Sequence, residues 1–393
     1  MLLRCSGMKN NKTPELRFSG FINDWEQRKL GEILKINSGR DYKHLLEGNI
    51  PVYGTGGYML SVNDKLSDDD AIGIGRKGTI NKPQLLNAPF WTVDTLFYMT
   101  VKEKISLLFC YSLASKIHWE KFDESTGVPS LSKASIDKIA INVPSFKEQI
   151  IIGSFFKQLD DTIALHQQEL NKLKQTKQGF LQKMFPREGD SVSELRFPGF
   201  IGDWEQGKLG NLADFSKGNG YTKNELTYEG KPVILYGRLY TKYETVINSV
   251  DTFTIEKEKS VISEGNEVIV PASGETSEDI SRASVVAKPG IILGGDLNII
   301  RPYEKINPTF LALTISNGKQ QKELSKRAQG KSVVHLHNSD LKEVNLIFPK
   351  IDEQTKIGNF FIQFDETIVL HQRELEVLKE TKKAFLQKMF INT

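Results

Sequence analysis

Several short patterns in this sequence contain residue types that bind nucleotides or metals in other proteins. The stretch "GIGRKG" (73–78) has the glycine spacing of a dinucleotide-binding loop. Such a loop must follow a strand and open a helix, because the helix N-terminus binds the phosphates. Here "TINKPQLLNAP" follows, which is a poor start for a regular helix. We therefore predict a tight turn between strands that presents Arg76 and Lys77.

A second pattern, "NPTF" (307–310), is similar to the Asn-Pro-Pro-aromatic motif of adenine methyltransferases. Thr309 stands in its third position, however, and no convincing glycine-rich cofactor loop accompanies it. Asn307 is a natural N-cap and Pro308 a natural first helical residue, so we predict a helix start. "EGK" (229–231) lacks the acidic partner of a metal-dependent nuclease, and we find no Ser-His-Asp or His-Glu-x-x-His pattern. We therefore predict no catalytic residue.

The composition places the chain among soluble globular proteins. Its 393 residues allow two or three domains, and 39% are hydrophobic and 26% charged. No apolar run reaches about 18 residues, so we expect no membrane span, and the polar N-terminus is no signal peptide. Cys5 and Cys110 form neither a zinc site nor a disulfide framework, which suits a cytoplasmic protein. The net charge of +3 means that any nucleic-acid contact must come from local patches. We expect residues 1–14 to form a loose tail, in which Met8 is a possible native start.

One unit occurs twice in the sequence. Residues 148–185 and 353–390 share 25 identities in 38 positions without a gap, and both end in "FLQKMF". Residues 15–33 and 194–212 share 14 identities in 19 positions. The middles between these matches barely resemble each other, and the second is 26 residues longer. With a period near 200 residues, this is a duplicated domain and not a solenoid.

The common tails have the spacing of a helix with one narrow, mostly apolar seam. Gly and Pro are absent between Phe155 and Gln178, so we predict a helix from Phe155 to Phe185, about 46 Å long at ~1.5 Å per residue. The seam positions alternate in steps of four and three residues. They are Leu159, Ile163, His166, Leu170, Leu173, Lys177, Phe180 and Met184 in the first tail, and Phe364, Ile368, His371, Leu375, Leu378, Lys382, Phe385 and Met389 in the second.

A lone apolar seam of this length needs a partner, and the chain supplies one. The simplest closure pairs the two helices antiparallel and relates the two middles by a pseudo-twofold axis. The alternative is that each helix packs only on its own domain. We interpret His166 and His371 as packed polar residues of the seam, with metal binding as the less favoured role.

Both middles have the pattern of mixed helix and strand structure. In the first, "IPVYGTGGYML", "DDAIGIGRKGTI" and "PFWTVDTLFYMTV" are strand-like, and "ISLLFCYSLASKIHWEKF" has helical spacing. In the second, "KPVILYGRLY", "NEVIVPASGETS" and "GIILGGDLNIIRP" occupy similar places, and "NPTFLALTISNGKQQKELSKR" is the predicted helix. We therefore expect an α+β protein whose two middles share a fold but differ in loop chemistry, as a two-part recognition protein requires.

Over essentially its full length the chain resembles the specificity subunit of type I restriction–modification systems. The resemblance is carried by the paired heads with "ELRF", "DWEQ" and "KLG", by the paired tails, and by "GRKGTINKPQLLNAPFWTVDTLFYM". In that family each middle is a target-recognition domain and each tail is a spacer helix, here an antiparallel coiled coil. The implied division is a flexible tail (1–14), target-recognition domains (15–147 and 188–352) and spacer helices (148–187 and 353–393).

The resemblance also implies a function. The family's subunit carries no catalysis, reads a bipartite, asymmetric site on double-stranded DNA, and holds two modification subunits that methylate adenine. Two restriction (motor-nuclease) subunits can join and cut. S-adenosylmethionine, ATP and magnesium are then expected on the partner subunits, with no cofactor on this chain. In the second middle "VPASGETSEDISRAS" replaces "GRKGTINKP", so its contacts cannot be carried over from the first.

Reading base edges needs groups that reach the major groove, where Arg favours guanine and Asn or Gln favours adenine. Lys, Ser and Thr also fix phosphates. In the first middle the candidate DNA-binding residues are Tyr53, Arg76, Lys77, Thr79, Asn81 and Lys82. In the second they are Tyr236, Arg238, Ser273, Thr276, Ser277 and Arg282. The alternative for any one of them is a solvated loop residue.

Two other classes of protein stay open at this point. One is a self-contained DNA methyltransferase or nuclease, for which binding of S-adenosylmethionine to the purified chain is the test. The other is a coiled-coil scaffold with no DNA role, which a mobility-shift assay with genomic fragments would separate. The sequence does not predict which bases are read.

Overall fold

The computed structural model describes residues 3–5, 12–277, 280–328 and 333–391. The chain divides into two compact units. Unit 1 comprises residues up to Gln167 together with the residues from Arg373 onward, and unit 2 comprises Gln168–Gln372. The end of the chain therefore completes the unit that the beginning of the chain starts. Met8, the possible native start, lies outside the described residues.

Two long helices, α4 (Phe146–Lys183) and α9 (Ile351–Met389), supply residues to both units. We predicted that the first would begin at Phe155. It begins earlier, at Phe146, and Gly153 lies inside it. A Cβ atom on Gly153 would stand 2.7 Å from the backbone nitrogen of Phe109 in α2 (Leu107–Lys116). The glycine is therefore needed for close packing of two helices and does not end α4.

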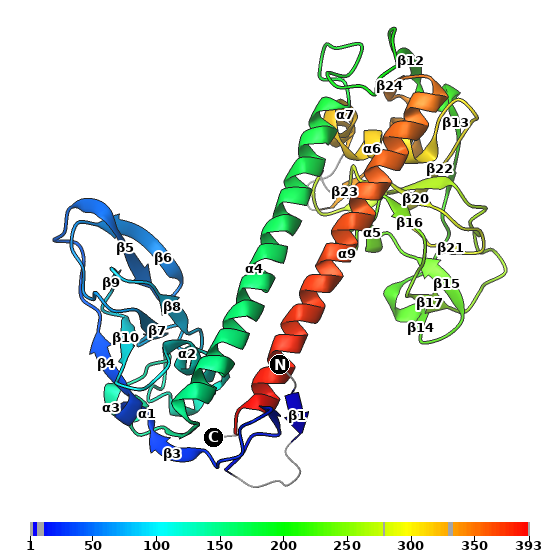
Figure 1. Ribbon diagram of the computed structural model, residues 1–393. Helices are drawn as coiled ribbons and strands as arrows, with labels where there is room; N and C mark the ends of the chain where they lie inside the picture. Colours follow the sequence, from blue (N-terminus) through cyan, green and yellow to red (C-terminus); the bar gives the residue numbers. More distant parts are fainter. Residues whose placement is uncertain (1–2, 6–11, 278–279, 329–332, 392–393) are drawn as a thin grey trace. The chain divides into compact units, whose positions relative to one another are not determined.

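Unit 1 is built on a four-stranded antiparallel sheet in the order β4-β10-β7-β8. A second sheet, β6-β5-β9, joins a hairpin to a parallel strand. The elements, in chain order, are β2 (Leu16–Phe18), β3 (Glu26–Lys29), α1 (Leu30–Ile33), β4 (Leu34–Ser38), β5 (Glu47–Gly54), β6 (Gly57–Val62), β7 (Ala71–Gly75), β8 (Gln84–Leu86), β9 (Trp91–Thr92), β10 (Leu96–Val101), α2, the 3-10 turn η1 (Trp119–Phe122), α3 (Lys133–Asp137) and β11 (Ala140–Val143). β11 pairs with β3 beside the start of α4. Figure 1 shows these elements gathered around the first turns of α4.

The expected loose tail is partly a strand. β1 (Leu3–Cys5) pairs antiparallel with β2 through Leu3↔Phe18, Arg4↔Arg17 and Cys5↔Leu16. The backbone of this segment is thus held by the ladder of β2, a pairing that its mostly polar sequence did not indicate.

Unit 2 repeats the central sheet of unit 1 with additions. Its main sheet has the order β13-β22-β18-β20-β16, and the first four strands pair as β4, β10, β7 and β8 do. β15 pairs parallel with β21 as β5 does with β9. The elements are β12 (Glu205–Lys208), the 3-10 turn η2 (Leu209–Asn211), β13 (Ala213–Lys217), the 3-10 turn η3 (Lys223–Glu225), β14 (Leu226–Thr227), β15 (Lys231–Ile234), α5 (Arg238–Thr241), β16 (Val246–Ile247), β17 (Phe253–Thr254), β18 (Glu267–Pro271), β19 (Ser273–Gly274), β20 (Ser284–Val286), β21 (Ile292–Leu293), β22 (Leu297–Pro302), α6 (Pro308–Ser316), α7 (Gly318–Arg327), β23 (Val334–His335), α8 (Asn338–Lys342) and β24 (Asn345–Phe348). The prediction that the two middles share an α+β fold is confirmed.

The cap at Asn307 is confirmed, but the helix that follows is shorter than predicted. The Asn307 side chain accepts hydrogen bonds from the N–H groups of Thr309 and Phe310 at 3.0 and 3.1 Å. The single helix predicted over 307–327 is divided into α6 and α7. Gly318 has φ +66° at the break, a left-handed conformation that glycine adopts without strain.

The ends of the long helices complete the hydrophobic core of each unit. In unit 1, Phe390 lies 6.2 Å from Trp25 between ring centroids, and both are buried. In unit 2, Phe185 stacks on Phe310 at 5.6 Å, and both are buried. Because Phe390 comes from the second tail, unit 1 cannot complete its core from the first half of the chain alone.

Each head is anchored to a long helix by a bidentate ion pair. In unit 1, Arg17 Nε and Nη2 donate to the two carboxylate oxygens of Glu148 at 2.6 and 2.7 Å. In unit 2, Arg196 makes the same pair with Glu353 at 2.8 and 2.7 Å. The repeat in the sequence is therefore also a repeat of buried contacts.

None of the helices, over the described residues, is both long and apolar enough to cross a membrane.

Candidate nucleic-acid interface

The turn after β7 is the best-defined part of the candidate interface in unit 1. The N–H groups of Arg76 and Lys77 point to the carbonyl oxygen of Thr95, at 2.8 and 3.3 Å. On the other side, Leu131 N–H donates to the Arg76 carbonyl at 2.9 Å. Both side chains are exposed, and Gly78 has φ +92°. The prediction of a turn that presents Arg76 and Lys77 is confirmed, and no helix follows to bind a nucleotide.

The residues after this turn lie at the surface of the same unit. Asn81 and Lys82 are exposed, and Thr79 is half-buried. Asn81 Nδ2 donates to Glu120 Oε1 at 2.6 Å. A backbone hydrogen bond, and then this amide, hold the pKa of Glu120 below its usual value. Asn81 is therefore held by an acidic partner, while Lys82 projects to solvent.

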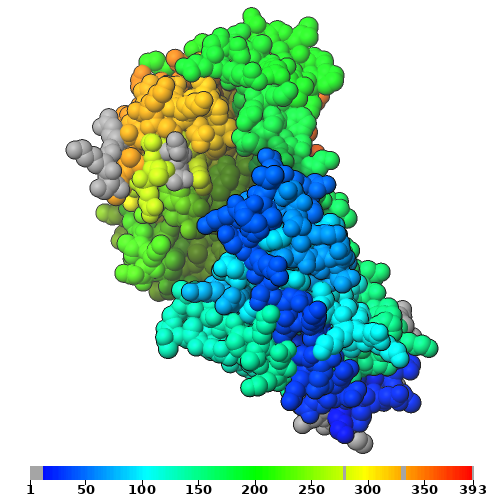
Figure 2. Space-filling view, turned by 90° about the vertical axis from the view of Figure 1, so that its left-hand side faces the viewer, coloured from blue at the N-terminus to red at the C-terminus, as the bar shows by residue number. Residues whose placement is uncertain are grey.

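The hairpin formed by β5 and β6 adds residues that sequence reasoning missed. Gln84 Nε2 donates to the carbonyl oxygens of Gly54 and Thr55 at 2.9 and 3.2 Å, which ties the hairpin tip to β8. Tyr58 and Met59 follow the tip and are exposed, whereas Tyr53, our candidate, is half-buried. The hairpin region, drawn in blue, lies at the surface of unit 1 (Figure 2). The sequence signal that could have identified Tyr58 is an aromatic residue directly after the glycines of "GTGGYM".

Unit 2 contains the same turn with different side chains. Ala272 N–H donates to the Asp296 carbonyl at 2.7 Å, and Leu336 N–H donates to the Ala272 carbonyl at 3.0 Å. These are the bonds that Arg76 makes with Thr95 and Leu131 in unit 1. In the sheet, Pro271 pairs with Leu297 as Gly75 pairs with Leu96. Ala272 and Ser273 therefore take the places of Arg76 and Lys77.

The structure contradicts the prediction that Arg238 contacts DNA. Its side chain is only 8% exposed and forms ion pairs with Glu244 and Asp251, both at 2.7 Å. Hydrogen bonds from Lys242 and then from Arg238 lower the pKa of Asp251 to about 2. The guanidinium thus holds the α5 region together, and its charge is already compensated. A buried arginine paired with two carboxylates does not reach a base edge.

The other candidates of unit 2 differ in accessibility. Tyr236 and Thr276 are exposed, and Ser277 is half-buried. Ser273 is buried, and its hydroxyl lies 3.1 Å from His335 Nδ1. Arg282 lines a hollow of about 420 Å³ together with Lys174 and Lys177 of α4. Tyr240 links two of these candidates, since its ring lies 6.2 Å from that of Tyr236 and its hydroxyl donates to the Ser273 carbonyl at 2.8 Å.

Within each unit, α4 and α9 run antiparallel in the same register. In unit 1, Lys382 pairs with Asp160, and in unit 2, Lys177 pairs with Asp365. The phenylalanines repeat the pattern, since Phe385 meets Phe155 and Phe180 meets Phe360, each at 5.1 Å between ring centroids. All sixteen seam positions that we named are buried or half-buried, among them Leu159, Ile163, His166, Leu170, Leu173, Phe364, Ile368, His371, Leu375 and Leu378.

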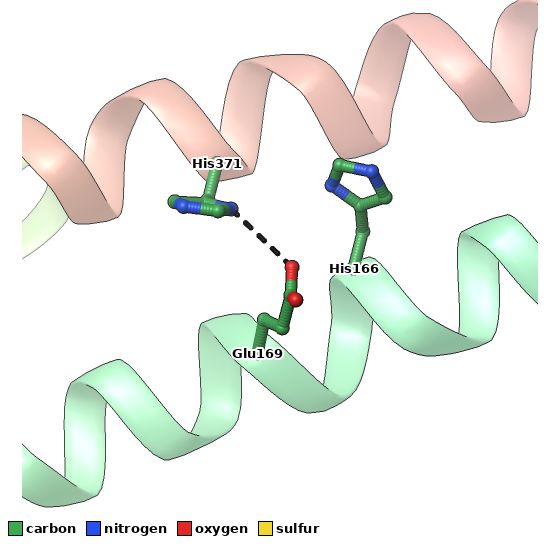
Figure 3. Close-up of side chains that lie close together, drawn as sticks. All are labelled: His166, Glu169 and His371. Atoms are coloured by element: carbon green, nitrogen blue, oxygen red, sulfur yellow. Dashed lines mark ion pairs between the residues drawn. The ribbon is translucent and has the colours of Figure 1, made fainter.

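The two seam histidines each face a carboxylate of the other long helix in their own unit. His371 Nδ1 lies 4.0 Å from Glu169 Oε2 in unit 2 (Figure 3). His166 Nδ1 lies 3.8 Å from Glu374 Oε2 in unit 1. These pairs repeat the internal symmetry of the sequence, and they fit our interpretation of packed polar residues on the seam.

Large apolar side chains stand on the outward faces of both long helices. Leu165 of α4 is 54% exposed, and its counterpart Leu370 of α9 is 56% exposed. Phe146 and Ile351, at the two helix starts, are a second matching pair of exposed apolar residues. Each long helix thus exposes an apolar side chain at the same two positions of the repeat.

The comparisons with known proteins agree with this architecture. The family described as "Type I restriction modification DNA specificity domain" matches residues 22–175 and 201–380. The chain belongs to this family. Its members recognise DNA for type I restriction–modification complexes, and this chain is a specificity subunit of that kind. The tandem match corresponds to the two middles and most of the two tails.

Individual relatives cover most of the chain. The MjaVIII specificity subunit of Methanocaldococcus jannaschii is 23% identical over 402 residues, covering 92% of this chain and 91% of the relative. The type I S subunit of M. genitalium has a solved structure with a TM-score of 0.69 and 16% identity, covering 97% of this chain and all of that one. A further structure, solved in work on complex assembly of the type I R-M system, has a TM-score of 0.52, 15% identity and 93% coverage of this chain. The two structures support the fold.

Proposed function

We propose that unit 1 and unit 2 of this specificity subunit each read one half of a bipartite, asymmetric DNA site. The observation that carries the proposal is the repeated turn, which has the same backbone hydrogen bonds at Arg76 and at Ala272 but different side chains. A common backbone with unlike side chains lets two similar modules present different donors and acceptors to base edges. The two halves of the site then differ in sequence.

The proposal includes the partners. Two modification subunits, which carry S-adenosylmethionine and methylate adenine, dock on the outward faces of α4 and α9 near Leu165 and Leu370. Two restriction subunits, which carry ATP and magnesium, join this assembly. The matched exposure of the two leucines supports two equivalent docking positions, one from each copy of the repeat. This chain supplies recognition, and its partners supply the chemistry.

A map of methylated adenines tests the proposal. The chain would be expressed with its modification subunits in cells that lack other adenine methylation, and the genome sequenced for modified bases. We expect one motif of two short defined parts separated by undefined bases. Methylation without such a motif, or the same motif in cells that lack this chain, would show that this chain does not select the site.

Replacing Arg76 by Ala is expected to weaken specific DNA binding by roughly 1–3 kcal/mol, the range for a lost bidentate contact to guanine. The fold should persist, because Arg76 is exposed and its hydrogen bonds in the turn come from the backbone. Its guanidinium adds a cation–π contact with the Phe97 ring at 5.8 Å. The measurement is a titration of the assembled complex with specific and with scrambled duplexes. Arg28, which pairs at the surface with Glu32 at 3.6 Å, is the control arginine. Equal losses on both duplexes would indicate a phosphate contact, and no loss would remove Arg76 from the interface.

A further inference from the structure

The repeated turn aligns two segments whose sequences do not match. In unit 1 the turn after β7 faces the segment 129–131, where Lys77 forms a bridge with Ser130. In unit 2 the equivalent residues form the short strand β19. It pairs with β23 through Ser273↔His335 and Gly274↔Val334. His335 therefore occupies the place of Ser130, opposite the turn.

The facing segment in unit 2 continues in the same register. Leu336 corresponds to Leu131, and both are buried. The next residue, His337, donates its N–H to Asp340 Oδ2 at 2.9 Å. Ser132 in unit 1 makes the equivalent bond to the Ser135 hydroxyl at 3.2 Å. His337 therefore stands where unit 1 has Ser132.

The two units thus carry their longer polar side chains on opposite sides of the same pair of segments. Unit 1 has Arg76 and Lys77 on the turn and two serines on the facing segment. Unit 2 has Ala272 and Ser273 on the turn and two histidines on the facing segment. The longer side chains therefore lie on the turn in unit 1 and on the facing segment in unit 2, although the two segments pair in the same way.

His335 and His337 form an ordered, accessible pair. Both are exposed on either side of buried Leu336, in an extended segment that begins with β23 and ends at His337, the N-cap of α8, so their side chains point to the same side. Their rings are nearly parallel, at 3° with 6.4 Å between centroids. His335 Nδ1 lies 3.1 Å from the Ser273 hydroxyl, which fixes the ring orientation and leaves Nε2 directed elsewhere.

We propose that His335 and His337 are the base-reading residues of unit 2, taking the role that Arg76 and Lys77 have in unit 1. The proposal rests on the proposed function, since it assigns the residues by which the second half-site is read. A neutral imidazole has one donor and one acceptor nitrogen, whereas Arg and Lys only donate. Because the Ser273 hydroxyl engages Nδ1 of His335, Nε2 is the nitrogen that this ring offers to a base. The two histidines together would then supply the donor and the acceptor that match N7 and N6 of adenine in the major groove.

The test is the methylation map of cells that carry single alanine substitutions. His335→Ala and His337→Ala, with unchanged modification subunits, are compared with the unsubstituted chain. We expect one or two positions in one half of the motif to become degenerate, with the other half unchanged. Arg76→Ala identifies the halves, because it should affect the half that the histidine variants leave intact.

Two controls separate a reading role from a structural one. Tyr228 is fully exposed and follows β14, which belongs to another sheet than β19 and β23, so Tyr228→Ala controls for loss of an exposed ring. His335→Gln keeps a donor and an acceptor, so it should retain more discrimination than His335→Ala. Thermal unfolding of each assembled variant verifies the fold.

The outcomes are distinct for the two proposals. If the unsubstituted chain produces a bipartite motif and both histidine variants keep it unchanged, the assignment of His335 and His337 is wrong while the proposed function stands. A uniform loss of methylation at all sites, with both half-sites still defined, would make them phosphate contacts and also overturn the assignment. Absence of any bipartite motif in the unsubstituted complex would overturn the proposed function itself.

Discussion

Replacing Arg17 by Met is expected to lower the free energy of unfolding of unit 1 by about 3–5 kcal/mol, the usual cost of breaking a buried ion pair from one side. The side chains of Arg17 and Glu148 are 4% and 1% exposed, so the carboxylate left behind stays buried without its partner. Arg17 also donates to the Asn23 carbonyl at 2.7 Å, and that bond is lost too. Hydrogen exchange measured on peptides from each unit would locate the loss.

The duplicated chain offers a matched comparison for this substitution. Arg196→Met breaks the equivalent pair with Glu353, but the Arg196 side chain is 18% exposed, so water can reach the carboxylate more easily. We expect a smaller loss, and we expect it in unit 2. The double variant Arg17→Met with Glu148→Met should recover most of the stability, because no charge then remains buried. A loss within the ~0–1 kcal/mol of a surface pair for Arg17→Met would contradict the argument.

Replacing both Leu165 and Leu370 by Asp is expected to abolish adenine methylation by the complex. Both side chains are more than half exposed, so the substitutions should leave this chain folded. In a docked complex, however, each new carboxylate would be buried against an apolar partner surface without compensation. A cost of about 3 kcal/mol or more per position lowers affinity by at least about a hundredfold.

The experiment compares co-purification of the modification subunits with the double variant and with a charge control. Gln168 is exposed on α4, and Gln168→Asp adds a carboxylate without removing an apolar group. We expect the control to retain its partners and the double variant to lose them, with helical content unchanged in both. Normal co-purification of the double variant would show that the partners dock elsewhere, while loss with both the double variant and the control would point to a general effect of charge.

Much of the architecture followed from the sequence because its signals are local. The seam repeats every seven residues, so one helix face could be identified without any knowledge of the partner. Asn307 marks a helix start because its side chain can accept hydrogen bonds from the N–H groups two and three residues later, and the structure contains both bonds. Gly78 after Arg76 and Lys77 indicates a turn for an equally local reason, since glycine permits a positive φ, and Gly78 has one. The repeat itself needed only comparison of the chain with its own sequence.

The tertiary structure decided what depends on residues far apart in the chain. We predicted a helix start at Phe155, but α4 begins at Phe146 and contains Gly153, which packs against the backbone of Phe109. Arg238 looked like a free cation, but Glu244 and Asp251 surround it in the fold. The alignment of Ala272 with Arg76, and hence the position of His335 opposite the turn, depends on pairing between distant strands. Strands pair through backbone hydrogen bonds, which residues with different side chains can form alike. The two middles therefore have the same strand pairing although their sequences differ, and comparison of the sequences does not reveal it.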